Sequence, residues 1–173
     1  MTEGDVSPVR KKQKVCDIER IIMGEELTDE TINCAQQLLK SKYQQFNGFQ
    51  STLLQEKKMA LTDTQIRNKA TTVNCKEGEV KIYDSVFNSC DEETKLVVCN
   101  LFQADTAKQS PRIKVIHCQK QTGSKDCGVF SIGFATAIVL GLNPGKIMFL
   151  QPVMRAHLVN CFNKGEMVMF PYK

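Results

Sequence analysis

The feature that most constrains this fold is the apolar segment 127–140, which follows a turn containing Gly123 and Ser124. Its length and composition predict a helix that ends near Gly141. The helix begins at Cys127, which places this thiol beside unpaired N–H groups and the positive end of the helix dipole. Both favour thiolate over thiol. Cys127 is therefore a candidate nucleophile.

A second polar residue belongs to the same stretch. Gln121 stands six positions before Cys127, and its amide N–H is suited to stabilise a developing oxyanion. Each residue also has an ordinary interpretation. Cys127 is one of eight cysteines and would then be a buried cysteine at a helix start, while Gln121 would be an exposed loop residue.

Composition indicates a single folded domain. The chain has 173 residues, of which 42% are hydrophobic and 24% charged, as in globular proteins with a hydrophobic core. The net charge of +4 comes partly from Arg10, Lys11, Lys12 and Lys14. The remainder therefore has no strong basic face, and we expect no nucleic-acid partner.

The cysteines and the N-terminus indicate the compartment. No two cysteines form a C-x-x-C pair, so neither zinc nor a redox pair is predicted. The N-terminus has no apolar segment typical of a secretory signal, and no run is long enough for a membrane span. We therefore expect reduced thiols in the nucleus or cytoplasm. Residues 1–14 are predicted to be a flexible basic tail, acting as a nuclear-import signal or as a solvated charge run, and residues 15–173 the domain.

Patterning along the domain predicts mixed helices and strands. A helix capped by Thr28 carries Ile32, Ala35, Leu38 and Leu39 at helical spacing. A hairpin turn at 76–79 precedes a strand at 80–83, and a helix capped by Asp91 follows. A strand at 113–117 leads to the apolar helix, and a last helix spans about 153–163. The irregular order predicts an α+β domain with helices around a small sheet.

The stretch Q-x-G-S-x-D-C-G-V-F at 121–130 resembles the ubiquitin-like-protein-specific cysteine proteases, the SUMO-deconjugating and adenain-like group. Segment 27–33 resembles the start of the family's substrate-side helix. Segment 80–85, V-K-I-Y-D-S, resembles the strand that carries the catalytic acid, here Asp84. The resemblance covers roughly residues 25–165 and is nearest to transposon-borne relatives.

The resemblance implies a papain-like fold with a small mixed sheet flanked by helices. It also implies a monomeric thiol isopeptidase that acts on ubiquitin-like, SUMO-type proteins without metal or cofactor. Cys127 would be the nucleophile, Gln121 the oxyanion donor and Asp84 the acid that orients the base. An ordinary turn or capping acid is the alternative for Asp84.

One part of the family pattern is missing. In this family the general-base histidine, usually followed by tryptophan, lies on the strand before the strand that carries the acid. A strand, a turn and a second strand need about 15–20 residues, which places the histidine near Ile66 or Arg67. Neither is a histidine, and the chain has no tryptophan. We predict an incomplete region near 66–70, from an internal deletion or a faulty gene model, and a sheet that lacks one central strand.

The chain has two histidines, His117 and His157. For His117 we favour an ordinary strand histidine whose ring bonds to the backbone. For His157 we favour a structural or exposed residue. Without a base, catalysis is expected to be impaired. Two alternatives stay open: an inactive binding module for a ubiquitin-like protein, and a truncated product without stable function.

Overall fold

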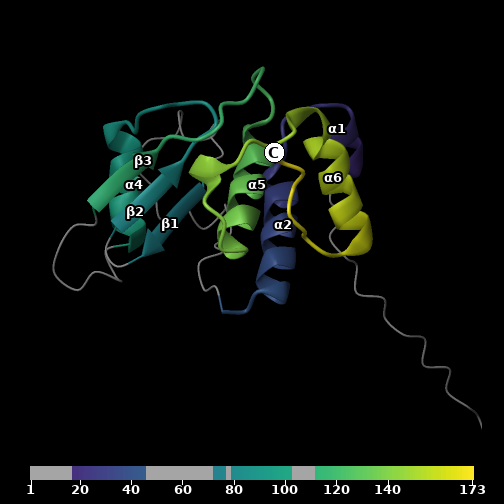
Figure 1. Cartoon of the computed structure of the whole chain (residues 1–173), viewed down its shortest axis with the longest axis horizontal. Helices are drawn as coiled ribbons and strands as arrows, with labels where there is room; N and C mark the ends of the chain where they lie inside the picture. The colour runs from purple at the N-terminus through teal and green to yellow at the C-terminus, as the bar shows by residue number, and fades with distance from the viewer. Residues whose placement is uncertain (1–16, 46–71, 77–78, 103–111) are drawn as a thin grey trace, which may run out of the picture.

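A computed structural model of the chain describes residues 17–45, 72–76, 79–102 and 112–173. A small sheet with one helix lies on one side of the molecule, and the other α-helices lie on the opposite side (Figure 1). The elements in order are α1 (Ile18–Ile22), α2 (Asp29–Lys42), β1 (Thr72–Lys76), β2 (Glu79–Tyr83), α4 (Glu92–Phe102), β3 (Arg112–Ile116), α5 (Cys127–Val139), the 3-10 helix η2 (Pro144–Lys146) and α6 (Gln151–Lys164). The predicted tail 1–14 and the region 66–70 lie outside the described residues.

The described sheet is mixed and has the strand order β1-β2-β3. β1 and β2 form the predicted hairpin and pair antiparallel, with Thr72 opposite Tyr83. β2 and β3 pair parallel, with Glu79 beside Arg112, and α4 lies between them in the chain. β1 therefore supplies an antiparallel neighbour to the strand that precedes Asp84, and its sequence TVNCK contains no histidine.

The two faces of β2 belong to two hydrophobic clusters, because successive strand side chains point to opposite faces. Val80 and Ile82 are buried with Val98 of α4. Tyr83 instead joins the larger cluster around α5, and its ring centroid lies 6.2 Å from that of Phe134. The sheet is therefore covered by α4 on one face and by the α5 side of the molecule on the other.

Helix α5 forms the centre of the larger cluster, which confirms the predicted apolar helix. Phe130 and Phe134 are both at most 1% exposed. Both rings pack against Phe149, at 6.0 and 5.7 Å between centroids. The helix ends at Val139, and Gly141 adopts φ 76°, a conformation that costs glycine little.

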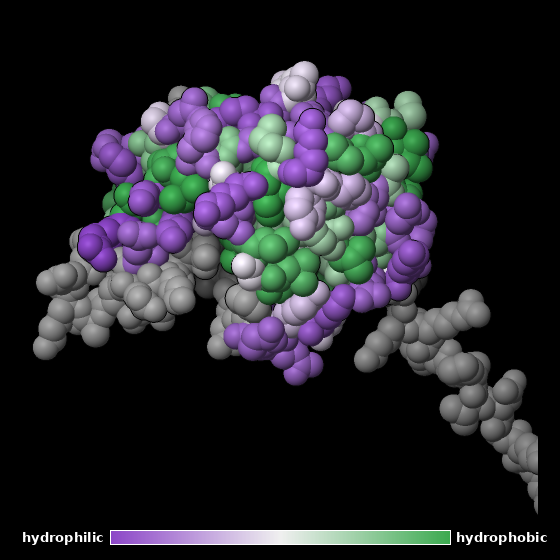
Figure 2. Space-filling view, in the orientation of Figure 1, coloured by the Kyte–Doolittle hydropathy of each residue, from purple (hydrophilic) through white to green (hydrophobic). Residues whose placement is uncertain are grey.

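The neighbouring helices begin where local signals place them. Thr28 caps α2, because its hydroxyl accepts a hydrogen bond of 3.3 Å from the backbone N–H of Thr31. Asp91 accepts from the N–H of Thr94 at 2.7 Å. Helix α6 begins at Gln151, earlier than the predicted 153, because Pro152 fits the first turn. Hydrophilic and apolar side chains are interspersed on the face seen in Figure 2.

Candidate functional site

The candidate acid lies at the end of β2. Asp84 is 8% exposed and Ser85 2%. The Oδ1 atom of Asp84 accepts hydrogen bonds from the backbone N–H groups of Val86 and Phe87, at 2.7 and 2.9 Å. These bonds close a tight turn directly after the strand and fix the position of the carboxylate.

Parallel pairing brings the segment after β3 to the same place, because parallel strands end at the same edge of a sheet. The ammonium group of Lys120 donates to the backbone carbonyls of Asp84 and Phe87, at 2.7 and 2.5 Å. The thiol of Cys118 donates to the Asp84 carbonyl at 3.4 Å. The acid segment and the segment that leads to Gln121 are therefore joined by several bonds.

Gln121 itself is held by Ser85. The backbone N–H of Gln121 donates to the carbonyl of Ser85 at 3.0 Å, and the Ser85 hydroxyl donates to Oε1 of Gln121 at 2.8 Å. The amide nitrogen of Gln121 donates to the carbonyl of Gly123 at 3.0 Å. An amide NH₂ has two donors, and this bond uses one of them.

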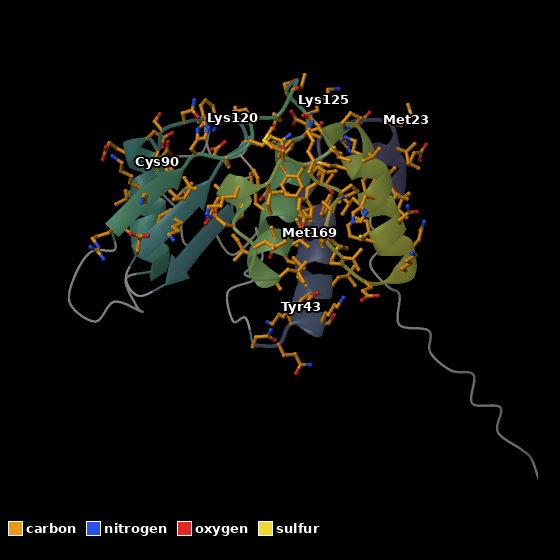
Figure 3. All side chains as sticks on the ribbon, viewed as in Figure 1. Met23, Tyr43, Cys90, Lys120, Lys125 and Met169 are labelled. Atoms are coloured by element: carbon orange, nitrogen blue, oxygen red, sulfur yellow. The ribbon has the colours of Figure 1, made fainter. Side chains whose placement is uncertain are left out.

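The loop between Gln121 and Cys127 is anchored to the start of α6. The side chain of Gln151 accepts from the N–H of Thr122 and donates to its carbonyl, both at 2.9 Å. Its amide also donates to Oδ2 of Asp126 at 2.6 Å. Lys120, directly before Gln121, and Lys125, within this loop, lie along one edge of the molecule with Met23 (Figure 3). This is the edge at which α5 begins (Figure 1).

Cys127 is the first residue of α5 and is partly exposed. Asp126 occupies the N-cap position, but its side chain makes no capping hydrogen bond. Other thiols have different surroundings, since burial raises the pKa of Cys118 and of Cys161. Cys127 is the thiol that combines a helix start with partial exposure in the described part of the chain.

The two histidines lie in different parts of the fold, and His117 belongs to the segment that leads from β3 to Gln121. His117 follows β3 and its side chain is exposed. His157 lies on α6 with its Nε2 atom 3.2 Å from the Val168 carbonyl and 3.5 Å from the thiol of Cys161. Its ring packs against that of Phe170 at a tilt of 51°, with 4.8 Å between the ring centroids. The described contacts of His157 therefore attach it to the C-terminal segment.

The structure brings the segments of Asp84 and Gln121 into direct contact, and the loop after Gln121 leads to Cys127. Sequence reasoning missed the residues that hold these segments: Ser85, Lys120, Gln151 and Arg155. Gln151 and Arg155 are four apart, so they share one face of α6, and this spacing was the available signal. Ser85 directly follows the candidate acid but carries no signal for its distant partner.

In the described part of the chain, no helix is long and apolar enough to cross a membrane. A cavity of about 290 Å³ is lined by residues that include Tyr83, Ile138 and Leu142. It lies toward the C-terminal end of α5 and is distinct from the edge where Cys127 begins this helix.

Comparison with solved structures defines the class of fold. The chain aligns with the SUMO protease Ulp1 with its catalytic cysteine oxidized to a sulfenic acid, at a TM-score of 0.56 and 11% identity, over 87% of this chain and 84% of that one. The same protease with that cysteine oxidized to a sulfinic acid aligns at a TM-score of 0.57 and 11% identity. This alignment covers 86% of this chain and 83% of that one. The protein thus has a Ulp1-like α+β fold. Comparison of the sequence with family models and with curated proteins found no match.

Proposed function

We propose that this chain is a SUMO-protease-like domain that engages a ubiquitin-like modifier, with Cys127 as its nucleophile. The observation that carries the proposal is the direct bonding of Ser85 to Gln121, within a Ulp1-like fold, at the edge where α5 begins with Cys127. A thiol at a helix start, an oriented amide and a buried carboxylate are three of the four groups that a thiol protease uses.

The reaction assigns each group a step. The thiolate of Cys127 attacks the carbonyl carbon of an isopeptide bond, an S–C bond forms, and the carbonyl electron pair moves onto oxygen. The resulting oxyanion accepts hydrogen bonds from the amide of Gln121 and from the first N–H groups of α5. When the intermediate collapses, the C–N bond breaks and leaves a thioester on Cys127. The departing amine then needs a proton.

The proton step is the weak one in this chain. Asp84 would orient an imidazole, but β1 carries no histidine, His117 is exposed directly after β3, and His157 bonds to the C-terminal segment. Loss of general acid–base help costs about 10²–10⁴-fold in rate. We therefore propose a domain that captures an activated modifier more readily than it hydrolyses an isopeptide.

A SUMO protein that ends in an electrophilic warhead tests the nucleophile. A warhead needs no protonated leaving amine, so we expect labelling of Cys127 even without a base. Cys127→Ala should abolish labelling, and Cys90→Ala, which removes another partly exposed thiol, should not change it. Absence of labelling by well-folded protein, for SUMO and for other ubiquitin-like probes, would refute the proposal.

The second candidate is a binding module without chemistry, favoured by the histidine-free β1. Calorimetric titration of the Cys127→Ala variant with a panel of ubiquitin-like proteins distinguishes the two functions. Binding without labelling or cleavage supports the module, whereas labelling together with slow cleavage of a linear fusion supports the impaired protease. A sharp cooperative melting transition in the same samples would exclude a truncated product without stable structure.

A further inference from the structure

We infer that Arg155 is a positioning residue for Cys127, and that it acts by drawing the Asp126 carboxylate away from the start of α5. This inference rests on the proposed role of Cys127 as nucleophile. It adds to that role an ion pair between Arg155 and Asp126. This ion pair keeps the N–H groups at the start of α5 available to stabilise negative charge on the sulfur of Cys127 and on a substrate oxygen.

The ion pair is well defined. Nε and Nη2 of Arg155 lie 2.8 and 2.7 Å from Oδ1 of Asp126. The two side chains are 17% and 20% exposed. The other carboxylate oxygen accepts from Gln151 at 2.6 Å. Both oxygens of Asp126 are therefore bonded to side chains of α6, and partial burial makes this pair less screened than a surface ion pair.

The consequence appears at the first turn of α5. Aspartate is a preferred N-cap residue, whose carboxylate ordinarily accepts from the N–H groups at the second or third helical position. Asp126 occupies the N-cap position without making that bond. A carboxylate in the ordinary position would occupy these donors and would place a negative charge beside Cys127. Both effects disfavour the thiolate, whereas the positive helix end favours it.

Arg155 is itself fixed by backbone carbonyls. Nη1 donates to the carbonyls of Ile21 and Glu25, at 3.2 and 2.8 Å. Nη2 donates to the carbonyl of Lys125 at 2.9 Å. The guanidinium thus joins α1 and the segment after it, the loop before Cys127, and α6. A lysine keeps the charge but cannot reproduce this fork of donors.

The test measures alkylation of Cys127 by iodoacetamide across a range of pH, with peptide mass spectrometry to separate this thiol from the others. For Arg155→Ala we expect an alkylation rate about tenfold lower at neutral pH. The pH profile of this rate should move upward by about one unit, which is the effect expected of a nearby uncompensated charge. Arg155→Lys should be intermediate. Arg20→Ala, which removes an exposed ion pair with Glu25, is the matched control and should react as the wild type does.

The double variant Asp126→Ala, Arg155→Ala separates this mechanism from general damage. Without the carboxylate there is nothing to move onto the helix start, so most of the lost reactivity should return. Equal rates for Arg155→Ala and wild type, or a double variant as slow as Arg155→Ala, would overturn the inference. Iodoacetamide needs no modifier, so failure of labelling by SUMO and by other ubiquitin-like probes would refute the proposed function, while the iodoacetamide rates would still test the effect of Arg155 on Cys127.

Discussion

The hydroxyl of Ser85 donates a hydrogen bond to the side-chain oxygen of Gln121 across 2.8 Å, between residues 36 positions apart in the chain. The hydroxyl alone could also accept, but the amide nitrogen of Gln121 donates to the Gly123 carbonyl, which can only accept, and this bond fixes which end of the amide is nitrogen. The two bonds together determine that Gln121 presents donors, and not an acceptor, on the side away from Ser85.

Ser85→Ala should weaken the oxyanion site without unfolding the protein. Loss of one such hydrogen bond is worth about 1 kcal/mol, or about fivefold in rate. We expect labelling of Cys127 by a SUMO-type warhead to slow by about that factor. Ser124→Ala, at an exposed position of the loop between Gln121 and Cys127, is the control and should leave the rate unchanged. Equal labelling rates for Ser85→Ala and wild type would show that the bond has no such role.

Gly145→Ala should destabilise the fold through a steric clash. A Cβ at this position would lie 2.9 Å from the carbonyl oxygen of His117 and 3.1 Å from the Ile116 side chain. Backbone at that distance must shift, which costs about 1–3 kcal/mol in the free energy of unfolding. Urea unfolding measures it, with Lys146→Ala at the adjacent exposed position as control. A midpoint equal to that of the control would contradict the predicted clash.

Phe134→Ala should be among the most damaging substitutions in the larger cluster. Its ring contacts Tyr83 of the sheet and Phe149 beyond η2, and it is 1% exposed. Removing a buried phenylalanine costs about 3–5 kcal/mol. Calorimetric melting provides the measurement, and Leu96→Ala, where the side chain is 57% exposed, gives the matched control. A similar melting temperature for both variants would show that the sheet does not depend on α5.

Alkaline pH should destabilise the fold through its buried thiols. Burial raises the pKa of Cys118 and of Cys161 above their unfolded values. The neutral thiols therefore contribute their full stability below the unfolded pKa, and this contribution is lost as pH rises through the folded pKa. We expect the melting temperature to fall above about pH 8.5, where unfolded thiols begin to ionise. The fall should be smaller for Cys161→Ala, and an unchanged slope in that variant would argue against the assignment.

Local chemistry made the helices predictable. Thr28, Asp91 and Gly141 each act on their own turn, and an apolar run such as 127–140 can hardly form anything but a buried helix. The strand at 80–83 and its hairpin were equally local. Sequence reasoning missed the short helix α1, which lies between the predicted tail and the cap at Thr28 and which packs beside α6.

The connections within the site were not predictable from sequence, because they join distant segments. Parallel pairing of β2 with β3 places Lys120 against the Asp84 carbonyl, and nothing near either residue encodes that pairing. The residues Asp84, Gln121 and Cys127 were chosen for their residue types and their resemblance to a motif. Their supporting residues Ser85 and Arg155 act through bonds that only the folded chain contains.

The bond between Arg155 and the carbonyl of Ile21 spans 134 positions of the chain. During synthesis the N-terminal part emerges first, so α1 and Cys127 leave the ribosome before α6 can dock. A nascent chain that stops short of Gln151 has neither partner of the Asp126 carboxylate. On the role proposed for Arg155, the thiol of Cys127 therefore reaches its reactive state only after the last helix has docked.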